Sequence, residues 1–167
     1  MIQASTLVKR LDLQPHPEGG YFKEVYRSNE LIKAEGLPER YSSERCFGTS
    51  IYYMLEGEQF SAFHKLQSDE TWHFYLGSPI VLHLISSEGN YSKIVLGQNI
   101  TEDENLQYTI LKETWFAAEE KVKSSFSLVG CTVAPGFDFA DFEFGKRDEL
   151  TKLFPAQSEI ILKFTHD

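Results

Sequence analysis

The segment GEQFSAFHKLQSDETWHFYLG, residues 57–77, decides the expected fold. It contains two short strands, residues 60–66 and 71–76, separated by a polar turn. Side chains alternate between the two faces of a strand, so each strand has one largely apolar face that is expected to point inward. These inward faces hold Phe60, Ala62, His64 and Leu66 around the first strand and Glu70, Trp72, Phe74 and Leu76 around the second.

His64 and Glu70 are the unusual members of these faces. A carboxylate and an imidazole that face an apolar interior are costly unless they pair or serve a ligand. Burial raises the pKa of a carboxyl group and a nearby imidazole lowers it, a combination typical of acid/base sites. The structural alternative is a hydrogen-bonded His–Glu pair without chemistry, because structural ion pairs also perturb pKa values.

The rest of the chain repeats the strand pattern. Further strands are predicted at residues 21–27, 49–55, 80–86, 91–96, 106–111, 115–119 and 126–133. Strands at intervals of about ten residues favour an all-β sandwich or barrel. Helices are predicted at residues 5–13 and 146–154, and a further short element near residues 159–164. The polar residues 28–46 are predicted to form a long surface excursion. We expect residues 1–167 to form one domain.

Composition limits the class of protein. Acidic residues number 25 against 16 basic ones, which gives a formal charge of −9 and disfavours nucleic acid and anionic membranes as partners. The N-terminus lacks the pattern of a secretory signal, and no apolar run approaches the roughly 20 residues of a membrane helix. Cys46 and Cys131 form no disulfide framework. We therefore expect a cytoplasmic protein with two reduced, buried thiols.

Residues 57–77 resemble the first motif of the cupin superfamily, which contains a glycine, two alternating histidines, a glutamate and a second glycine. Gly57, His64, Glu70 and Gly77 fit this motif, and Leu66 replaces the second histidine. The second cupin motif, with its proline, glycine and histidine, would fall on residues 111–116 and is lost.

The chain is most similar to one branch of the cupins, a domain of unknown function. The matching segments are PHPEGGYF (15–22), YRS (26–28), residues 64–77, Trp115 with Ala117, and LVGCTVAPGF (128–137). The resemblance implies a double-stranded β-helix, that is, a jelly-roll barrel with a pocket at its mouth, and a homodimer. It implies no activity, because fold alone does not determine function.

Metal-binding cupins commonly offer three histidines and one glutamate to a divalent ion. Only His64 and Glu70 remain of that set, with His16 as a third candidate from the N-terminal segment. Two protein ligands are fewer than catalytic zinc or non-haem iron sites normally use. No cofactor is therefore expected, and a divalent metal held by His64 and Glu70 is the alternative.

Deoxysugar 3,5-epimerases are metal-free cupins, and residues 18–24 are similar to their N-terminal strand, although its arginine is missing here. This similarity suggests His64 as the base, Glu70 as the group that orients it, and Tyr21 or Tyr53 as the acid. A binding or sensing module without chemistry is the competing hypothesis. Its aromatic pocket would contain Trp72, Phe74, Tyr108 and Trp115.

We expect an all-β jelly-roll domain with a short N-terminal helix and a helical C-terminal tail, acting as a homodimer on a small polar, sugar-like ligand. The candidate catalytic residues are His64, Glu70 and Tyr21. The candidate ligand-binding residues are Glu18, Tyr53, Trp72, Phe74, Tyr108 and Trp115; Glu18 is included because Gly19 and Gly20 let its loop approach a pocket closely. The chemistry suggested is that of a metal-free epimerase or isomerase. A non-catalytic binding module and a metal-dependent cupin enzyme remain the alternatives.

Overall fold

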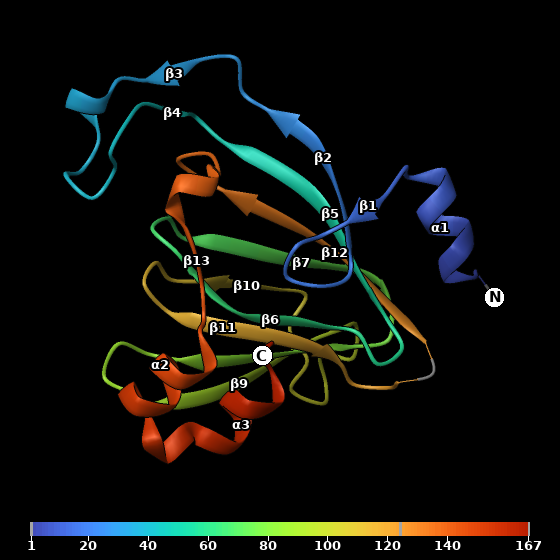
Figure 1. The fold of residues 1–167 in the computed structure, drawn as a ribbon. Coiled ribbons are helices and arrows are strands. Elements are labelled where there is room, and N and C mark those ends of the chain that lie inside the picture. The colour runs from blue at the N-terminus through green and yellow to red at the C-terminus, as the bar shows by residue number, and fades with distance from the viewer. Residues whose placement is uncertain (1, 124, 167) are drawn as a thin grey trace.

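Two sheets of antiparallel strands face each other (Figure 1). The computed structural model describes residues 2–123 and 125–166. The first sheet has the order β1 (Gln14–Pro15), β2 (Tyr21–Arg27), β5 (Thr49–Glu56), β12 (Phe126–Val133), β7 (Glu70–Gly77) and β10 (Gln107–Ile110). The second has the order β13 (Phe142–Phe144), β6 (Phe60–Leu66), β11 (Trp115–Glu120), β8 (Ile80–Ile85) and β9 (Tyr91–Leu96). The predicted jelly-roll barrel is confirmed.

The predicted strands agree with the observed ones to within one residue at each end. The strands that the sequence did not reveal are short: β1, β13 and the separate pair β3 (Leu31–Ile32) and β4 (Arg45–Cys46). Segments of two or three residues cannot display a period of two, so alternation carries no signal there.

Helices cover the outer faces of both sheets (Figure 1). α1 (Ala4–Arg10) packs against the first sheet, and α2 (Arg147–Leu153) and α3 (Ser158–Lys163) pack against the second. α1 ends earlier than predicted because the chain turns at Asp12, whose φ of 53° is left-handed. Single 3₁₀ turns form η1 (Ala34–Gly36), η2 (Phe139–Asp141) and η3 (Pro155–Gln157). Within the described residues, the helices are all too short and too polar to cross a membrane.

The space between the sheets is filled by large apolar side chains. Buried members of this core include Tyr53, Leu55, Trp72, Phe74, Leu82, Phe116 and Val129. Burial of such side chains supplies the main driving force for packing the sheets together.

A β-bulge in β6 changes which side chains of that strand point inward. Phe116 of β11 pairs with His64, but Ala118 pairs with Ser61, so β6 contains one extra residue between these pairs. The expectation that Phe60 lies on the inward face is therefore wrong, because Phe60 and Phe63 both pack with the outer cluster under α2 and α3. Beyond the bulge the alternation resumes, and His64 lines the interior as predicted.

A second bulge lies in β7. Val129 of β12 pairs with Phe74 and Leu128 pairs with Leu76, so the intervening residue of β7 has no partner in β12. Trp72 and Phe74 point inward as predicted. Leu76 instead packs on the outer face with the cluster that α1 covers, which corrects its predicted orientation.

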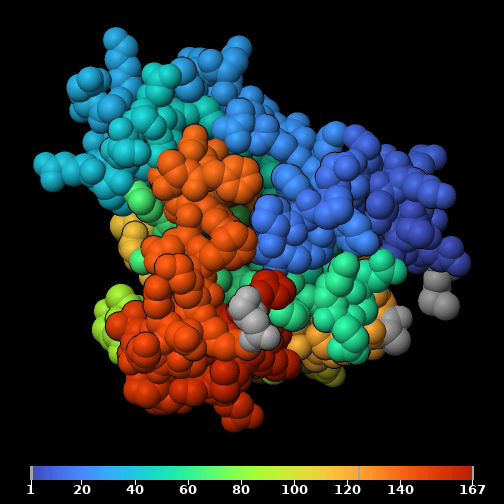
Figure 2. All heavy atoms as spheres, viewed as in Figure 1, coloured from blue at the N-terminus to red at the C-terminus, as the bar shows by residue number. Residues whose placement is uncertain are grey.

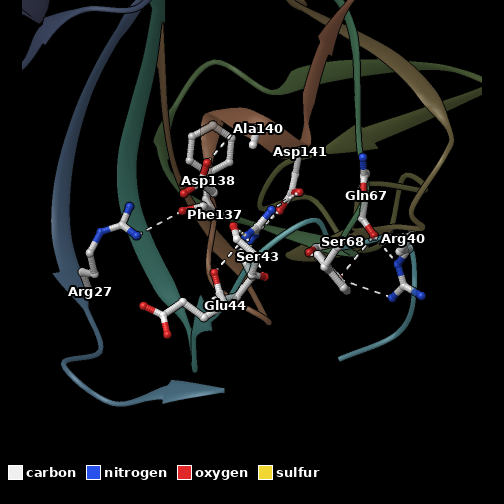
Figure 3. Close-up of polar contacts among 12 residues, drawn as sticks. Arg27, Arg40, Ser43, Glu44, Gln67, Ser68, Phe137, Asp138, Ala140 and Asp141 are labelled. Atoms are coloured by element: carbon white, nitrogen blue, oxygen red, sulfur yellow. Dashed lines mark hydrogen bonds and ion pairs between the residues drawn. The ribbon is translucent and has the colours of Figure 1, made fainter. Parts of the chain in front are cut away.

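Residues 28–46, expected as a surface excursion, are anchored to the barrel by polar contacts (Figure 3). Arg45 is 2% exposed and donates two hydrogen bonds to Asp141, over 2.7 and 2.6 Å. Tyr41 Oη lies 2.8 Å from Ser68 Oγ, and Arg40 donates to the carbonyl oxygen of Gln67 over 2.8 Å. A bidentate Arg–carboxylate pair fixes orientation as well as distance, so this segment has a defined position on the barrel.

Glu120, at the end of β11, gives a prediction about stability. It is 1% exposed, and the backbone of Ser125 and Ser127 lowers its pKa by less than burial raises it. Burial raises the pKa of Glu120 to about 7, against the opposing effect of Lys123. Because the pKa is higher in the folded than in the unfolded chain, stability falls as the pH rises from about 5 to about 7. Glu120→Gln should therefore raise the free energy of unfolding relative to the wild type, and this gain should be about 1–2 kcal/mol larger at pH 8 than at pH 5.

Urea unfolding of both proteins from pH 5 to pH 8 measures this difference. Glu58→Gln is the matched control for the loss of a carboxylate, because Glu58 is exposed. A Glu120→Gln effect that is equal at pH 5 and pH 8 would contradict the prediction.

Candidate functional site

A cavity of about 280 Å³ opens between the sheets, at the end where β5 begins and β12 ends. Its aromatic walls are Phe22, Tyr53, Trp72, Phe137, Phe139 and Phe142. Its acidic, basic and imidazole side chains are His16, Glu18, Glu24, Arg27, His64, Glu70 and Asp138. On the face shown in Figure 2, the orange chain after β12 lies beside the blue N-terminal segment, and both contribute lining residues. Apolar walls with a few converging polar groups are typical of small-molecule sites.

His64 is held rigidly in this cavity. Its Nδ1 lies 2.7 Å from the carbonyl oxygen of Ala62, and its Nε2 lies 3.1 Å from Oε2 of Glu18. The ring also stacks on Phe142, with centroids 5.0 Å apart, and contacts Phe116 at 4.0 Å. The imidazole is 2% exposed, so its two nitrogens are solvated by the protein alone.

The contacts of His64 require one proton between the imidazole and Glu18. A carbonyl oxygen only accepts hydrogen bonds, so Nδ1 carries a hydrogen and donates it to Ala62. In the neutral ring Nε2 then presents a lone pair, which an ionised carboxylate would repel. A proton on one member of the Glu18–His64 pair removes this repulsion. Burial raises the pKa of Glu18 and lowers the pKa of His64, and both directions favour placing this proton on Glu18.

Glu18 reaches the cavity because the loop that carries it is fixed to the barrel. Its N–H donates to Nδ1 of His16 over 3.2 Å, and its carbonyl accepts from Ala62 N over 2.9 Å. Tyr53 Oη donates to the carbonyl of Gly19 over 2.8 Å. Gly19 has φ 111°, and a Cβ there would collide with the carbonyl oxygen of Phe60. The tight approach of the loop turns the Glu18 side chain inward.

Glu70 enters the cavity from the first sheet, whereas His64 comes from the second. The indole Nε1 of Trp72 donates to Oε2 of Glu70 over 2.9 Å. Burial raises the pKa of Glu70 to about 7, although Trp72 and His64 both lower it. Among the described residues Glu18, not Glu70, pairs with His64. The expectation that Glu70 orients His64 through a ring nitrogen is therefore wrong.

The remaining predicted site residues divide into two groups. Glu18, Tyr53 and Trp72 line the cavity together with His64 and Glu70. The others lie among different clusters: Tyr21 in the outer cluster covered by α1, Phe74 and Tyr108 in the core between the sheets, and Trp115 in the cluster covered by α2 and α3. The structure therefore does not bring Trp72, Phe74, Tyr108 and Trp115 together as one aromatic pocket.

Glu24 and Arg27 line the cavity but were not predicted as site residues. Alternation from Phe22 along β2 would have placed Glu24 inward. Arg27 has the opposite parity, and a register shift between Glu24 and Tyr26 turns it inward. Its guanidinium bonds both carboxyl oxygens of Glu24, over 3.1 and 2.7 Å.

The segment between β12 and β13 forms one side of the cavity mouth and was also missed. Phe137, Asp138, Phe139 and Phe142 all line the cavity. Figure 3 shows Arg27 reaching the carbonyl oxygen of Phe137, over 3.1 Å. Asp138 accepts from the N–H of Ala140 over 2.8 Å and so caps η2. In the sequence the three phenylalanines were marked only as aromatic and Asp138 not at all, because long-range pairing decides where these residues lie.

The Glu70–Trp72 contact gives a spectroscopic prediction. Because a hydrogen bond to a carboxylate is stronger than one to a neutral carboxyl, the Trp72 indole proton should move downfield as Glu70 ionises. Its resonance should titrate with a midpoint near pH 7 in ¹H–¹⁵N spectra. The Trp115 indole serves as an internal control and should stay constant. Loss of the titration is expected in Glu70→Gln, and a titration that persists in that variant would contradict the assignment.

The model of the family described as "Cupin superfamily (DUF985)" matches residues 5–145 of the chain. Protein SO0799 from Shewanella oneidensis has a similar solved structure, with 32% identity, a TM-score of 0.90 and coverage of 99% of both chains. A hypothetical protein from Leishmania major is 34% identical, with a TM-score of 0.89 and coverage of 99% of this chain and 100% of that one.

Two other similarities are weaker. The chain is 28% identical to the uncharacterized protein YML079W of Saccharomyces cerevisiae, over 95% of this chain and 83% of the yeast protein. Oxalate decarboxylase from Bacillus subtilis shares the fold alone, at 12% identity and a TM-score of 0.55, over 92% of this chain and 37% of that one. The family match covers most of the sequence and agrees with the jelly-roll fold. The chain therefore belongs to the cupin superfamily, in the family described as DUF985.

Proposed function

We propose that this protein is a metal-independent acid/base enzyme that isomerises or epimerises a small polar carbonyl compound inside the cavity. The observation that carries the proposal is the buried Glu18–His64 pair, with 3.1 Å between Nε2 and Oε2, in the same cavity as Glu70. Proton removal beside a carbonyl needs a base and an acid that work near neutral pH. The Glu18–His64 pair and Glu70, which line the same cavity, meet this requirement.

In the proposed mechanism Glu18 takes the proton from the substrate. The C–H proton beside the carbonyl passes to the second carboxyl oxygen of Glu18, while the proton that Glu18 shared moves onto Nε2 of His64. Glu70 in its acid form donates its proton to the carbonyl oxygen, which gives an enol and the Glu70 carboxylate. For isomerisation of a hydroxy carbonyl compound, Glu18 returns its proton to the former carbonyl carbon of the enediol, the Glu70 carboxylate takes the proton of the neighbouring hydroxyl, and the His64 proton returns to Glu18.

His64 has a supporting role in this mechanism, as the store of the displaced proton. Both of its nitrogens already have protein partners, so it is not the group that contacts the substrate. Burial holds the pKa of Tyr53 well above its ordinary value, and its hydroxyl is committed to Gly19. These features make Tyr53 a poor proton donor and favour Glu70 for that role.

The metal-dependent alternative does not fit the residues present. Leu66 lines the cavity at the place of the second cupin histidine, and Phe116 of the lost second motif packs on the His64 ring. Within the described residues, no group of three or more His, Cys, Asp or Glu side chains is arranged to hold a metal ion.

Metal content gives a direct check. Untagged protein purified without chelator should contain less than about 0.1 equivalent of iron, manganese, nickel or zinc per chain, because affinity requires more ligands than the cavity offers. Elemental analysis measures this, with His64→Asn protein as the control for adventitious metal. One equivalent in the wild type that is lost from His64→Asn would overturn the metal-independent mechanism.

Proton transfer can be followed without product identification. A panel of uncharged keto-sugars incubated in D₂O with the protein should include one whose carbonyl-adjacent C–H signal disappears from the ¹H spectrum. Glu18→Gln and Glu70→Gln should each lower the exchange rate by about 100-fold or more. The wild-type rate should also fall as the pH rises above about 7, because Glu70 must carry its proton to act as the acid.

Glu58→Gln is the control variant, since Glu58 is an exposed carboxylate. A compound that binds the wild-type protein and shows no exchange would contradict catalysis and favour the binding-module hypothesis. Exchange that survives in Glu18→Gln would instead show that the proton acceptor is a different group.

A further inference from the structure

We infer that the part of the ligand inside the cavity carries no negative charge, so that the site excludes phosphate and carboxylate groups. The inference rests on the proposed function in taking this cavity as the ligand site, and it adds the electrostatic class of the substrate. It rests on the charge and the bonding partners of the ionisable groups in the cavity wall.

Arg27 is the only lysine or arginine among the described residues that line the cavity. Nε and Nη2 bond the two carboxyl oxygens of Glu24, and Nη1 donates to the carbonyl oxygen of Phe137 and to Sγ of Cys46. All three guanidinium nitrogens therefore have partners, and Glu24 neutralises the charge. An incoming anion would have to displace this carboxylate from Arg27.

The other polar groups of the wall add no positive charge. Burial lowers the pKa of both His16 and His64, so both rings favour their neutral forms. Asp138 adds a carboxylate at the mouth, and Glu70 adds a second one whenever it ionises. The cavity thus ranges from weakly to clearly negative as the pH rises.

An anion in this cavity would lose its hydration without gaining a counter-ion. Taking an ion out of water is costly unless a partner of opposite charge or several hydrogen bonds replace the solvent. Repulsion by nearby carboxylates is also stronger here than in bulk water, because the surroundings are less polar. Uncharged hydroxyl and carbonyl groups avoid both costs.

The cavity offers what an uncharged ring compound needs. His16 accepts the Glu18 N–H at Nδ1, so its neutral ring has a hydrogen at Nε2. Glu70 and Asp138 provide acceptors for hydroxyl groups, and the rings of Phe22, Trp72 and Phe142 provide flat apolar surfaces. A polyhydroxy ring or keto-sugar without a phosphate matches this set.

Charged paramagnetic probes test the inference without knowledge of the natural ligand. Three nitroxides with the same ring, 4-hydroxy-TEMPO, 4-amino-TEMPO and 4-carboxy-TEMPO, are neutral, cationic and anionic at pH 7.5. Each broadens the indole N–H resonances of the wild-type protein according to how closely and how often it approaches. The Trp115 indole is the internal control for the protein's overall negative charge, because it lies in the cluster covered by α2 and α3 and does not line the cavity.

At low ionic strength the cationic probe should broaden the Trp72 signal at least about threefold more than the anionic probe, since surface potentials reach several kT. The ratio at Trp115 should be smaller. Equal or greater broadening of Trp72 by 4-carboxy-TEMPO would overturn the inference. Glu24→Gln leaves Arg27 without its counter-ion. In that variant the ratio of Trp72 broadening by the cationic probe to that by the anionic probe should therefore move toward one. An unchanged ratio in Glu24→Gln would also contradict the inference.

These measurements need no turnover, so their outcome is separable from that of the exchange assay. Exchange seen only with sugar phosphates or keto-acids would support the proposed function and overturn this inference. If the probes broaden Trp72 as expected and a keto-sugar binds but never exchanges, the inference about charge would be supported and the proposed function would be contradicted.

Discussion

The proton between Glu18 and His64 is the constraint on which the rest of the site depends. It joins the N-terminal loop to the second sheet across the cavity, and it lets a carboxyl and an imidazole remain buried without a net charge. Buried ionisable groups are tolerated when their partners and hydrogen bonds replace water, and each of these two groups meets that condition through the other. The glycines, the His16 contact and the stacked Phe142 all serve to hold this pair in one geometry.

Alternation and turn residues predicted the fold well. The long strands followed from period-two patterns, and the jelly roll followed from their number and from the cupin resemblance. The errors share one physical cause, because each bulge inserts a residue that alternation cannot detect. A bulge in β6 turned Phe60 outward, one in β7 turned Leu76 outward, and one in β2 turned Arg27 inward. On one side of each bulge alternation gave the correct orientation, and the parity on the other side depended on pairing with a distant strand.

The candidate site was predicted only in part, because some of its contacts join segments that are distant in the sequence. His64, Glu70, Trp72 and Tyr53 lie on strands whose inward faces were recognisable, whereas the partner of His64 comes from a loop 46 positions earlier in the chain. Local patterns carry no information about such a contact. This cupin differs from the metal-binding pattern at Leu66, which lines the cavity, and at Phe116, which packs on the His64 ring.

The buried Arg45–Asp141 pair joins residues 28–46 to the segment that forms the cavity mouth, so the position of the mouth depends on both segments. Asp141 adjoins the aromatic residues of the mouth, and Arg45 belongs to an excursion that contributes no residue of its own to the cavity wall. An isolated change at either position leaves an unmatched charge in the interior, so natural variation should alter the two positions together. Shortening the excursion to make a smaller barrel would therefore release the mouth as well, and any redesign of ligand preference must treat residues 28–46 and 137–142 as a single module.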